Sequence, residues 1–419
     1  MHLHANAPRL SLPTVIVVAL LTTLALSSWG STFAQPTLDG SWSVGVILSI
    51  SAGSPLGAQQ ARLAESSASA LGRAGVFGAP FVTVLRDDRG DPRQAELAAR
   101  ELIDEGVLAL VCCTSPAASE RVARLAAEAG IVMLGLDGAF SEALPVAGVL
   151  GSSGQQVWTL SLRSGARTQL TAVGVHAAEE GKSALALMTL DNTFGDEAAE
   201  AFERAMSDAG RQAVGTVQYS PSATVLTPEA LWAATREPGA VTVWGLANDT
   251  AIALDALRRR GWFGPAYVRA ESLAPGAWAR LELSGAAVVT PPVPGDSWWG
   301  VRVPVAPISL AEHLPPEHPN RDAALEVLAE LDAAGLRLDP VERANVALVA
   351  DALTLLQQAF EEVAALRLPP GLPVESWRQA VLDALLSAPP RALSAGTYQA
   401  RSGDSRLARW QGLVIARTR

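Results

Sequence analysis

Residues 81–134 are FVTVLRDDRGDPRQAELAARELIDEGVLALVCCTSPAASERVARLAAEAGIVML. Short apolar runs at 81–85, 107–111 and 131–134 alternate with two alanine-rich amphipathic segments. Each amphipathic segment opens on a capping residue followed by proline, Asp91-Pro92 and Ser115-Pro116, and ends at a glycine. Three apolar strands separated by two helices predict βαβ units in a parallel sheet.

The same alternation extends in both directions from this stretch. Upstream, residues 42–50 form a β-branched apolar run, and an amphipathic helix is expected at 57–72. Downstream, helices are expected at 167–180, 196–209, 228–236 and 249–260, with strands at 183–190, 213–219, 241–244 and 266–269. Further helices are expected at 321–334, 340–366 and 374–386. Two such series predict an α/β fold of two doubly wound, Rossmann-like lobes joined by a hinge.

The pattern also suggests where the lobes begin and end. We expect a targeting segment at 1–34, the first part of lobe 1 at 35–160, lobe 2 at 161–287, the second part of lobe 1 at 288–395 with an irregular Pro- and Trp-rich excursion at 291–319, and a C-terminal hairpin at 396–419 that returns to lobe 2. The hairpin is expected around Gly403-Asp404, which lie between two short β-like runs.

Composition excludes several classes of protein. The chain has 419 residues, enough for two or three domains at roughly 150 residues each. Hydrophobic residues make up 49% and charged residues 18%, which excludes general disorder. The formal net charge of −10 argues against nucleic acid as a partner, because nucleic acid needs a concentrated basic face.

The first 34 residues have the pattern of a secretory signal peptide. The apolar run at 15–26 has the length of a signal-peptide core and is short for a membrane span. Thr32-Phe33-Ala34 then places small side chains at the −3 and −1 positions of a cleavage site. We therefore expect cleavage after Ala34 and a mature periplasmic protein. The alternative is an uncleaved anchor helix.

A scan for catalytic and cofactor motifs finds none of the common ones. The sequence lacks GxGxxG after its first strand, GxxxxGK[ST], HExxH and GxSxG. Its two cysteines, Cys112 and Cys113, are adjacent, which does not fit a disulfide framework or a zinc site, and they are expected as buried residues at a strand end. The pair can bridge only through a strained eight-membered ring. No cofactor, metal site or catalytic residue is expected.

Polar residues follow the expected strands at their carboxyl ends, where open α/β sheets bind ligands. Helix N-termini at this edge offer N–H groups to an anion. The residues that follow strands are Asp87-Asp88, Thr114-Ser115, Asp137-Gly138-Ala139, 191–194, 247–249 and Glu271-Ser272. A hydroxyl at Ser115 can cap a helix and contact a ligand at once, and Glu271 is either a solvated loop carboxylate or a partner for a ligand ammonium group. Asp87 and Asp88 are expected to be structural residues of turns beside the cleft.

Three segments, 85–134, 187–210 and 243–272, carry a family resemblance. Their order of acidic pair, Asp-Pro, helix, Ser/Thr loop, aromatic-Gly helix start and glutamate-bearing strand end resembles periplasmic solute-binding proteins of the leucine/isoleucine/valine-binding type. Such proteins serve ABC importers of branched-chain amino acids and have the type I periplasmic binding fold. The resemblance covers most of residues 42–290 and, more loosely, the rest.

The resemblance implies roles for individual residues. Thr114 and Ser115 match the loop that holds the ligand α-carboxylate, Glu271 matches the acid that holds the α-ammonium, and Phe194 matches the aromatic that closes over the ligand. Two positions depart from the family pattern. Gly138-Ala139 stand where the family has Ala-Thr, with Asp137 beside them as a replacement carboxylate, and Ala247 stands where it has a tyrosine.

These observations together predict a non-enzymatic, monomeric solute-binding protein. It is expected to capture a branched-chain or other apolar amino acid, or a related amide or acid, by hinge closure and to deliver it to a membrane ABC permease. The alternatives are a sensor of the same fold that signals to a receptor, and a secreted α/β hydrolase. The missing nucleophile motif and the missing paired histidine argue against the hydrolase.

Overall fold

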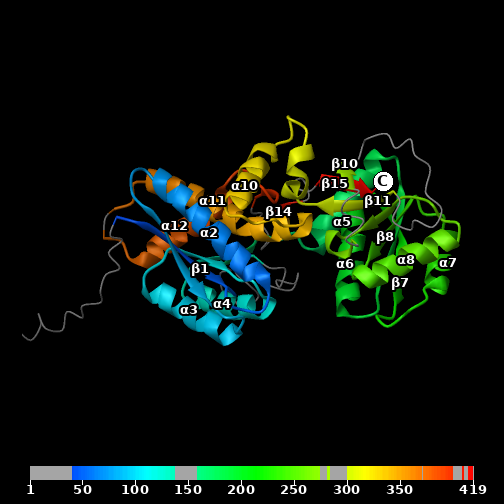
Figure 1. Ribbon diagram of the computed structural model, residues 1–419, viewed down its shortest axis with the longest axis horizontal. Helices are drawn as coiled ribbons and strands as arrows, with labels where there is room; N and C mark the ends of the chain where they lie inside the picture. Colours follow the sequence, from blue (N-terminus) through cyan, green and yellow to red (C-terminus); the bar gives the residue numbers. More distant parts are fainter. Residues whose placement is uncertain are drawn as a thin grey trace, which may run out of the picture. The chain divides into compact units, whose positions relative to one another are not determined.

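The computed structural model describes residues 40–136, 158–273, 281–283, 300–369, 371–399, 408–409 and 414–418 (Figure 1). The expected signal segment, residues 137–157 and the turn at Gly403-Asp404 lie outside the described residues. The described helices and strands group around two main sheets, which we call the first lobe and the second lobe after the order in which the chain enters them. No helix within the described ranges is long and apolar enough to cross a membrane.

The sheet of the first lobe is parallel throughout and has the order β2-β1-β3-β4-β5. Its strands are β1 (Trp42–Leu48), β2 (Phe81–Asp87), β3 (Ala109–Cys112), β4 (Val132–Gly135) and β5 (Thr159–Ser161). The helices α2 (Pro55–Ala74), α11 (Pro340–Ala365) and α12 (Val374–Ser387) pack on one face, and α3 (Pro92–Asp104) and α4 (Pro116–Glu128) pack on the other (Figure 1). Because both faces are covered, β3 and β4 are buried along their whole length.

The sheet of the second lobe has the order β10-β15-β11-β9-β8-β6-β7. Its strands are β6 (Ala184–Leu190), β7 (Gln212–Tyr219), β8 (Ala240–Trp244), β9 (Ala266–Val268), β10 (Leu281–Leu283), β11 (Val301–Val305) and β15 (Val414–Thr418). Strand β15 runs antiparallel to β10 and β11, and the other pairs are parallel. The helices α5 (Ala166–Glu179) and α6 (Thr193–Asp208) bury one face, while α7 (Thr227–Thr235) and α8 (Ala247–Arg259) bury the other. These two sheets confirm the predicted α/β class with parallel, doubly wound lobes.

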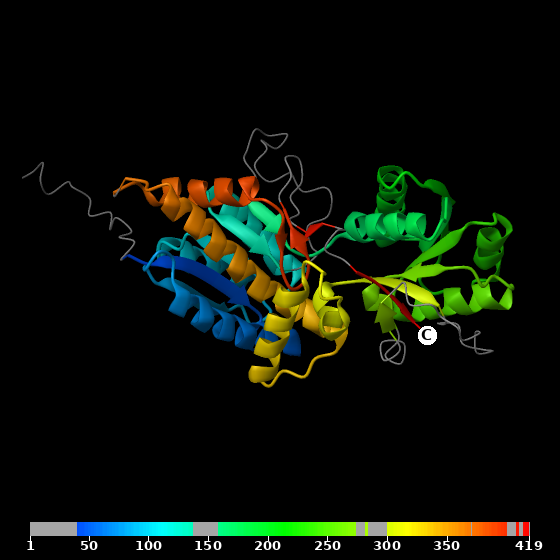
Figure 2. The same ribbon diagram turned by 90° about the horizontal axis from the view of Figure 1, so that it is seen from above.

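The chain passes between the lobes after β5, after β11 and before β15, as the colours of Figure 2 allow the reader to follow. The passage after β11 enters the 3₁₀ helix η2 (Pro307–His313) and α10 (Arg321–Ala333). An irregular excursion was expected at 291–319, but within its described residues Val301–Val305 forms the strand β11, which pairs with β9 and β15. Pro304 belongs to this strand, and the proline had favoured an irregular interpretation.

The segment before β15 is tied to the first lobe by buried polar groups. Short strands β12 (Arg391–Ala392), β13 (Thr397–Tyr398) and β14 (Ala408–Arg409) form a small antiparallel sheet. Asp351 of α11 is 2% exposed. Its carboxylate accepts hydrogen bonds from the N–H (3.1 Å) and hydroxyl (2.6 Å) of Ser394, the N–H of Ala395 (2.9 Å) and the hydroxyl of Tyr398 (2.9 Å). One carboxylate thus fixes the path of residues 394–398.

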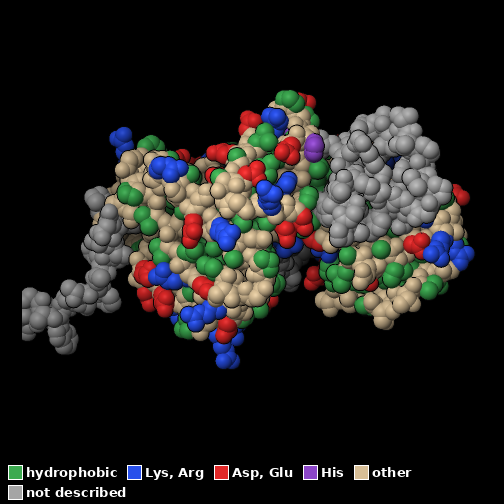
Figure 3. Space-filling model, viewed as in Figure 1, with side chains coloured by type: hydrophobic (Ala, Val, Ile, Leu, Met, Phe, Trp, Pro, Cys, Tyr) green, Lys and Arg blue, Asp and Glu red, His purple; other side chains and the backbone are tan. Residues whose placement is uncertain are grey.

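Charges of both signs are interspersed on the face of the molecule shown in Figure 3, where neither basic nor acidic side chains gather into a patch of one sign. Several of the acidic and basic side chains form surface ion pairs. Examples are Arg100 with Glu96 at 2.9 Å and Arg259 with Asp255 at 2.8 Å, each one helical turn apart. Such exposed pairs contribute at most about 1 kcal/mol each.

Candidate functional site

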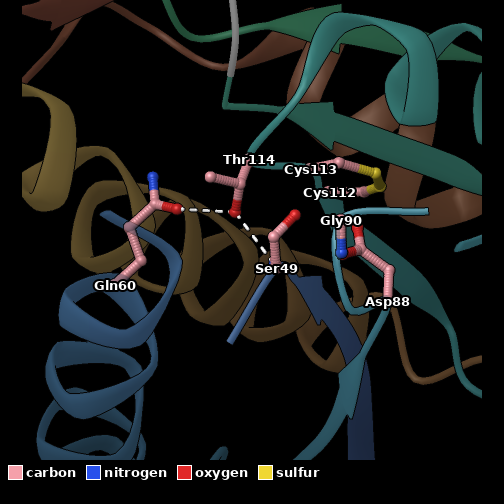
Figure 4. Close-up of a disulfide and its surroundings, with 7 residues drawn as sticks. All are labelled: Ser49, Gln60, Asp88, Gly90, Cys112, Cys113 and Thr114. Atoms are coloured by element: carbon pink, nitrogen blue, oxygen red, sulfur yellow. Dashed lines mark hydrogen bonds between the residues drawn. A yellow bond between two sulfur atoms is a disulfide. The ribbon is translucent and has the colours of Figure 1, made fainter. Parts of the chain in front are cut away.

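Thr114 and Ser115 lie in the loop that connects β3 to the N-terminus of α4. The Thr114 hydroxyl accepts a hydrogen bond from the N–H of Ser49 (3.1 Å) and donates one to the side-chain oxygen of Gln60 (3.1 Å), as Figure 4 shows. Ser115 has the extended backbone of an N-cap, but its side chain makes no capping hydrogen bond. The hydroxyl of Thr114 therefore ties the end of β1 and α2 to the loop, while that of Ser115 does not cap α4.

Cys112 and Cys113 lie immediately before this loop and are fully buried, as expected. They are joined to each other by a disulfide bond (Figure 4). Both pack in the hydrophobic core between the sheet and α3 and α4, together with Ile47, Leu110 and Met133. The pair thus belongs to the core beneath the loop.

The carboxylates of Asp87 and Asp88 accept hydrogen bonds from backbone N–H groups of the turns beside this loop. The carboxylate of Asp87 accepts hydrogen bonds from the N–H groups of Ile50 (2.9 Å) and Arg89 (2.9 Å), and that of Asp88 accepts one from the N–H of Gly90 (2.8 Å). These contacts agree with the structural role expected for the acidic pair.

Glu271 lies in the second lobe, in the short 3₁₀ turn η1 (Ala270–Ser272) that follows β9. The buried Ser272 hydroxyl donates to the carbonyl of Gly245 at the end of β8 (2.5 Å), which fixes the turn against the neighbouring strand. The Oε1 atom of Glu271 accepts a hydrogen bond from Nη2 of Arg163 (3.2 Å), and its Oε2 atom lies 3.4 Å from Nη2 of Arg269. The Glu271 carboxylate is therefore flanked by two guanidinium groups.

These two arginines decide the protonation of Glu271. Burial alone raises the pKa of this carboxyl group, but the charges of Arg269 and Arg163 and the hydrogen bond from Arg163 hold the pKa below its ordinary value. The side chain of Glu271 is 28% exposed, so solvent screens this effect only in part. Glu271 is thus ionised at neutral pH, and the three groups together carry a net charge of +1.

Two aromatic rings flank the guanidinium group of Arg269. Its Cζ atom lies 5.0 Å from the ring centre of Phe194, in the first turn of α6, and 5.2 Å from that of Trp244, at the end of β8. The side chain is only 16% exposed, and Nε is buried without a hydrogen-bond partner in the described part of the chain. Cation–π contacts orient this charge and shield it from water.

A cleft lies beside this charged group and contains about 610 Å³ free of protein atoms, in part open to solvent. The lining residues are Leu162, Arg163, Ser164, Gln169, Ala270, Glu271, Pro304, Ala306, Ser309, Val341, Ala344, Asn345, Leu348, Ala395 and Gly396. They come from the passages between the lobes, from α5 and β11, from η1 and from the first half of α11.

The buried side chain of Gln60 connects the Thr114 loop to this cleft. It accepts from Thr114 through Oε1 and donates through Nε2 to the carbonyl oxygen of Asn345, which lines the cleft (3.1 Å). The structure thus relates Thr114 to the cleft through Gln60 and α11, and it brings Phe194 and Glu271 together around Arg269. Ala247 begins α8, next to the exposed Leu246. Asp137, Gly138 and Ala139 lie outside the described residues.

Sequence reasoning missed Arg163, Arg269, Trp244 and Gln60 as parts of this region. Arg163 follows β5, a strand that was not expected from the sequence, and Arg269 was placed inside the strand expected at 266–269, whereas β9 ends at Val268. The strand-end argument applied to Thr114 therefore reached neither residue. Gln60 stands on the buried side of an amphipathic helix, where a polar residue requires a partner. In the described ranges, no group of three or more His, Cys, Asp or Glu side chains is placed to hold a metal ion.

Comparison with known proteins identifies the family. A family model described as periplasmic binding protein matches residues 41–299, well over half of the chain. The chain belongs to this family. The match confirms the resemblance to leucine/isoleucine/valine-binding-type proteins, and with the two lobes it confirms the type I periplasmic binding fold. The family is one of periplasmic, solute-binding, non-enzymatic proteins. No curated protein matches the chain.

Solved structures of low sequence identity share the fold. A putative branched-chain amino acid ABC transporter protein from Rhodospirillum rubrum is 18% identical with a TM-score of 0.66, over 89% of this chain and 99% of that one. An extracellular ligand-binding receptor from Rhodopseudomonas palustris HaA2 is 20% identical with a TM-score of 0.59, over 90% and 97%. The leucine binding protein LivK from Thermotoga maritima is 18% identical with a TM-score of 0.53, over 86% and 92%.

Proposed function

We propose that this chain captures a small solute of the amino-acid, amide or carboxylic-acid class between its two lobes and delivers it to a membrane ABC permease. The observation that carries the proposal is the cleft beside Glu271, which is lined by the passages between the lobes and by polar groups from strand ends and α11. The proposed ligand-binding residues are Thr114, Ser115, Asp137, Gly138, Ala139, Phe194, Ala247 and Glu271. Among the described ones, Glu271 lines the cleft, and Thr114 is linked to it through Gln60. A ligand held by both lobes stabilises the closed state.

Binding is expected to raise thermal stability and to reduce the radius of gyration. Ligand at 100 times its Kd adds about 2.7 kcal/mol to the free energy of unfolding, because it binds only the folded state. A thermal-shift screen over amino acids, their amides and the parent acids identifies the class. Small-angle scattering with the best compound then measures closure of the monomer.

A substitution in the cleft, compared with a matched substitution on the surface, tests whether ligand binds there. Ala344→Trp places an indole ring among the lining residues and is expected to abolish both responses. Leu97→Trp inserts the same ring on α3, where the native side chain is 52% exposed, and is expected to leave them unchanged. A radius that stays constant with saturating ligand would contradict capture by closure.

The first 34 residues are proposed to act as a cleaved signal peptide that directs the protein to the periplasm. Thr32-Phe33-Ala34 gives the small residues that a signal peptidase requires, and the mature chain is expected to begin at Gln35. Sequencing the amino terminus of exported protein tests this expectation. Recovery of a chain that still contains residues 15–26 would favour an uncleaved anchor instead.

A further inference from the structure

The charge balance around Glu271 differs from that of a site for an ammonium group. A desolvated ammonium requires an anion that other cations have not already neutralised. The carboxylate of Glu271 accepts a hydrogen bond from Arg163 through Oε1 at 3.2 Å, while Oε2 has no hydrogen-bond partner among the described residues and lies 3.4 Å from Nη2 of Arg269. One carboxylate and two guanidinium groups leave a net charge of +1 beside the cleft.

Both arginines retain donors that no described residue is shown to use. Each guanidinium group carries five N–H donors. Arg163 lines the cleft and donates one hydrogen bond to Glu271. The Nε atom of Arg269 is buried and lacks a partner among the described residues, although a buried donor without one is unfavourable. An anion entering the cleft meets Arg163, which lines it, and the net positive charge to which Arg269 contributes from outside the lining, whereas a cation meets repulsion.

From these contacts we infer that the ligand is a small organic acid, a carboxylate without an α-ammonium group, bound through the guanidinium groups of Arg163 and Arg269. The inference rests on the proposed function and specifies its ligand class. Glu271 then acts as a positioning residue that holds the two arginines apart and oriented. Phe194 and Trp244 keep Arg269 in place by cation–π contacts. The apolar part of the acid would pack against Leu162, Val341 and Leu348, which line the cleft.

The test compares, within each of two carbon skeletons, ligands that differ only in their polar groups. The probes are 4-methylpentanoate, 4-methylpentanamide and leucine, together with 3-phenylpropanoate, its amide and phenylalanine. Calorimetric titration is expected to show that one of the two carboxylates binds at least about tenfold more tightly than its amino acid and amide. An added ammonium would face the net positive charge, and the amide lacks the charge that the arginines recognise.

Variants separate this scheme from one in which Glu271 holds an ammonium group. Arg163→Gln and Arg269→Gln are each expected to weaken carboxylate binding on the order of 100-fold, with Arg163→Lys and Arg269→Lys recovering part of it. Glu271→Gln removes the carboxylate that orients the two arginines and is expected to weaken carboxylate binding less than either arginine-to-glutamine variant, because both guanidinium groups remain. Glu180→Gln is the matched control, since it weakens another ion pair of the second lobe, with Arg302 at 2.8 Å. Melting temperatures without ligand show whether each variant folds.

The outcomes distinguish the inference from the function on which it rests. Tight carboxylate binding that needs both arginines supports the inference. If leucine or phenylalanine binds most tightly, shrinks the radius of gyration and loses affinity in Glu271→Gln, the inference is overturned while the proposed function stands. If no probe of either skeleton raises the melting temperature of the native protein, both are overturned.

Discussion

The Asp351→Ala variant is expected to lose about 3–5 kcal/mol of the free energy of unfolding. The carboxylate is 2% exposed and accepts hydrogen bonds from Ser394, Ala395 and Tyr398. Alanine leaves two N–H groups and two hydroxyls in a buried site without their acceptor, and each such donor costs about 1–3 kcal/mol before the structure relaxes. Urea unfolding followed by circular dichroism measures the loss.

Two further variants test the cause of this loss. Tyr398→Phe removes a single donor and is expected to cost about 1 kcal/mol, because the other three hydrogen bonds remain. Asp332→Ala removes an exposed carboxylate from α10 and is expected to cost less than about 0.5 kcal/mol. A loss below about 1 kcal/mol in Asp351→Ala would mean that water replaces the carboxylate.

The Asp351 contacts illustrate what local sequence cannot predict. The helix α11 was expected at 340–366 and extends over Pro340–Ala365, because Asp339-Pro340 is a strong local start signal. The partners of Asp351 lie 43 to 47 residues further along the chain, in a segment with no regular pattern of its own. The periodic spacing of apolar residues predicts the helix and its buried face. Only the packed structure shows which distant groups contact that face.

The same limit applies to the candidate site. Glu271 was selected because it follows a strand, and the strand β9 indeed ends directly before its turn. Its partner Arg163 is separated from it by 108 residues and lies in a passage between the lobes. Strand ends gave the position of the carboxylate correctly, whereas its charge environment depends on how the chain crosses from one lobe to the other. This environment changes the chemistry expected of the ligand.

Strands were harder to predict than helix starts. The helix α3 begins at Pro92 with Asp91 accepting from the N–H of Arg93 (2.8 Å), as the Asp-Pro pair predicts. The strand β11 was not predicted, because Pro304 interrupts a short apolar run and proline cannot donate to a strand ladder. The antiparallel partner of β11 is β15, more than 100 residues further along the chain, so local pattern carried no sign of the pairing.

The Gly195→Ala variant is expected to lose about 3 kcal/mol of the free energy of unfolding and to bind ligand poorly. Gly195 lies in the first turn of α6, where a Cβ atom would overlap the carbonyl oxygen of Leu190 and come within 2.7 Å of its carbonyl carbon. Leu190 ends β6, so the obstacle is backbone and cannot rotate away. The start of α6 must move, at the upper end of the cost of overpacking.

This shift reaches the candidate site through the neighbouring residue. Phe194 packs against the cores on both faces of the second sheet and lies 5.0 Å from the guanidinium group of Arg269. Displacing α6 therefore moves the ring that orients this charge, and affinity for the best compound of the thermal-shift screen is expected to fall together with stability. Gly53→Ala is the matched control, because no atom lies within 4 Å of its added Cβ. Urea unfolding measures the stability of both variants, and calorimetric titration measures their affinity. Wild-type stability with wild-type affinity in Gly195→Ala would show that α6 is not fixed by this contact.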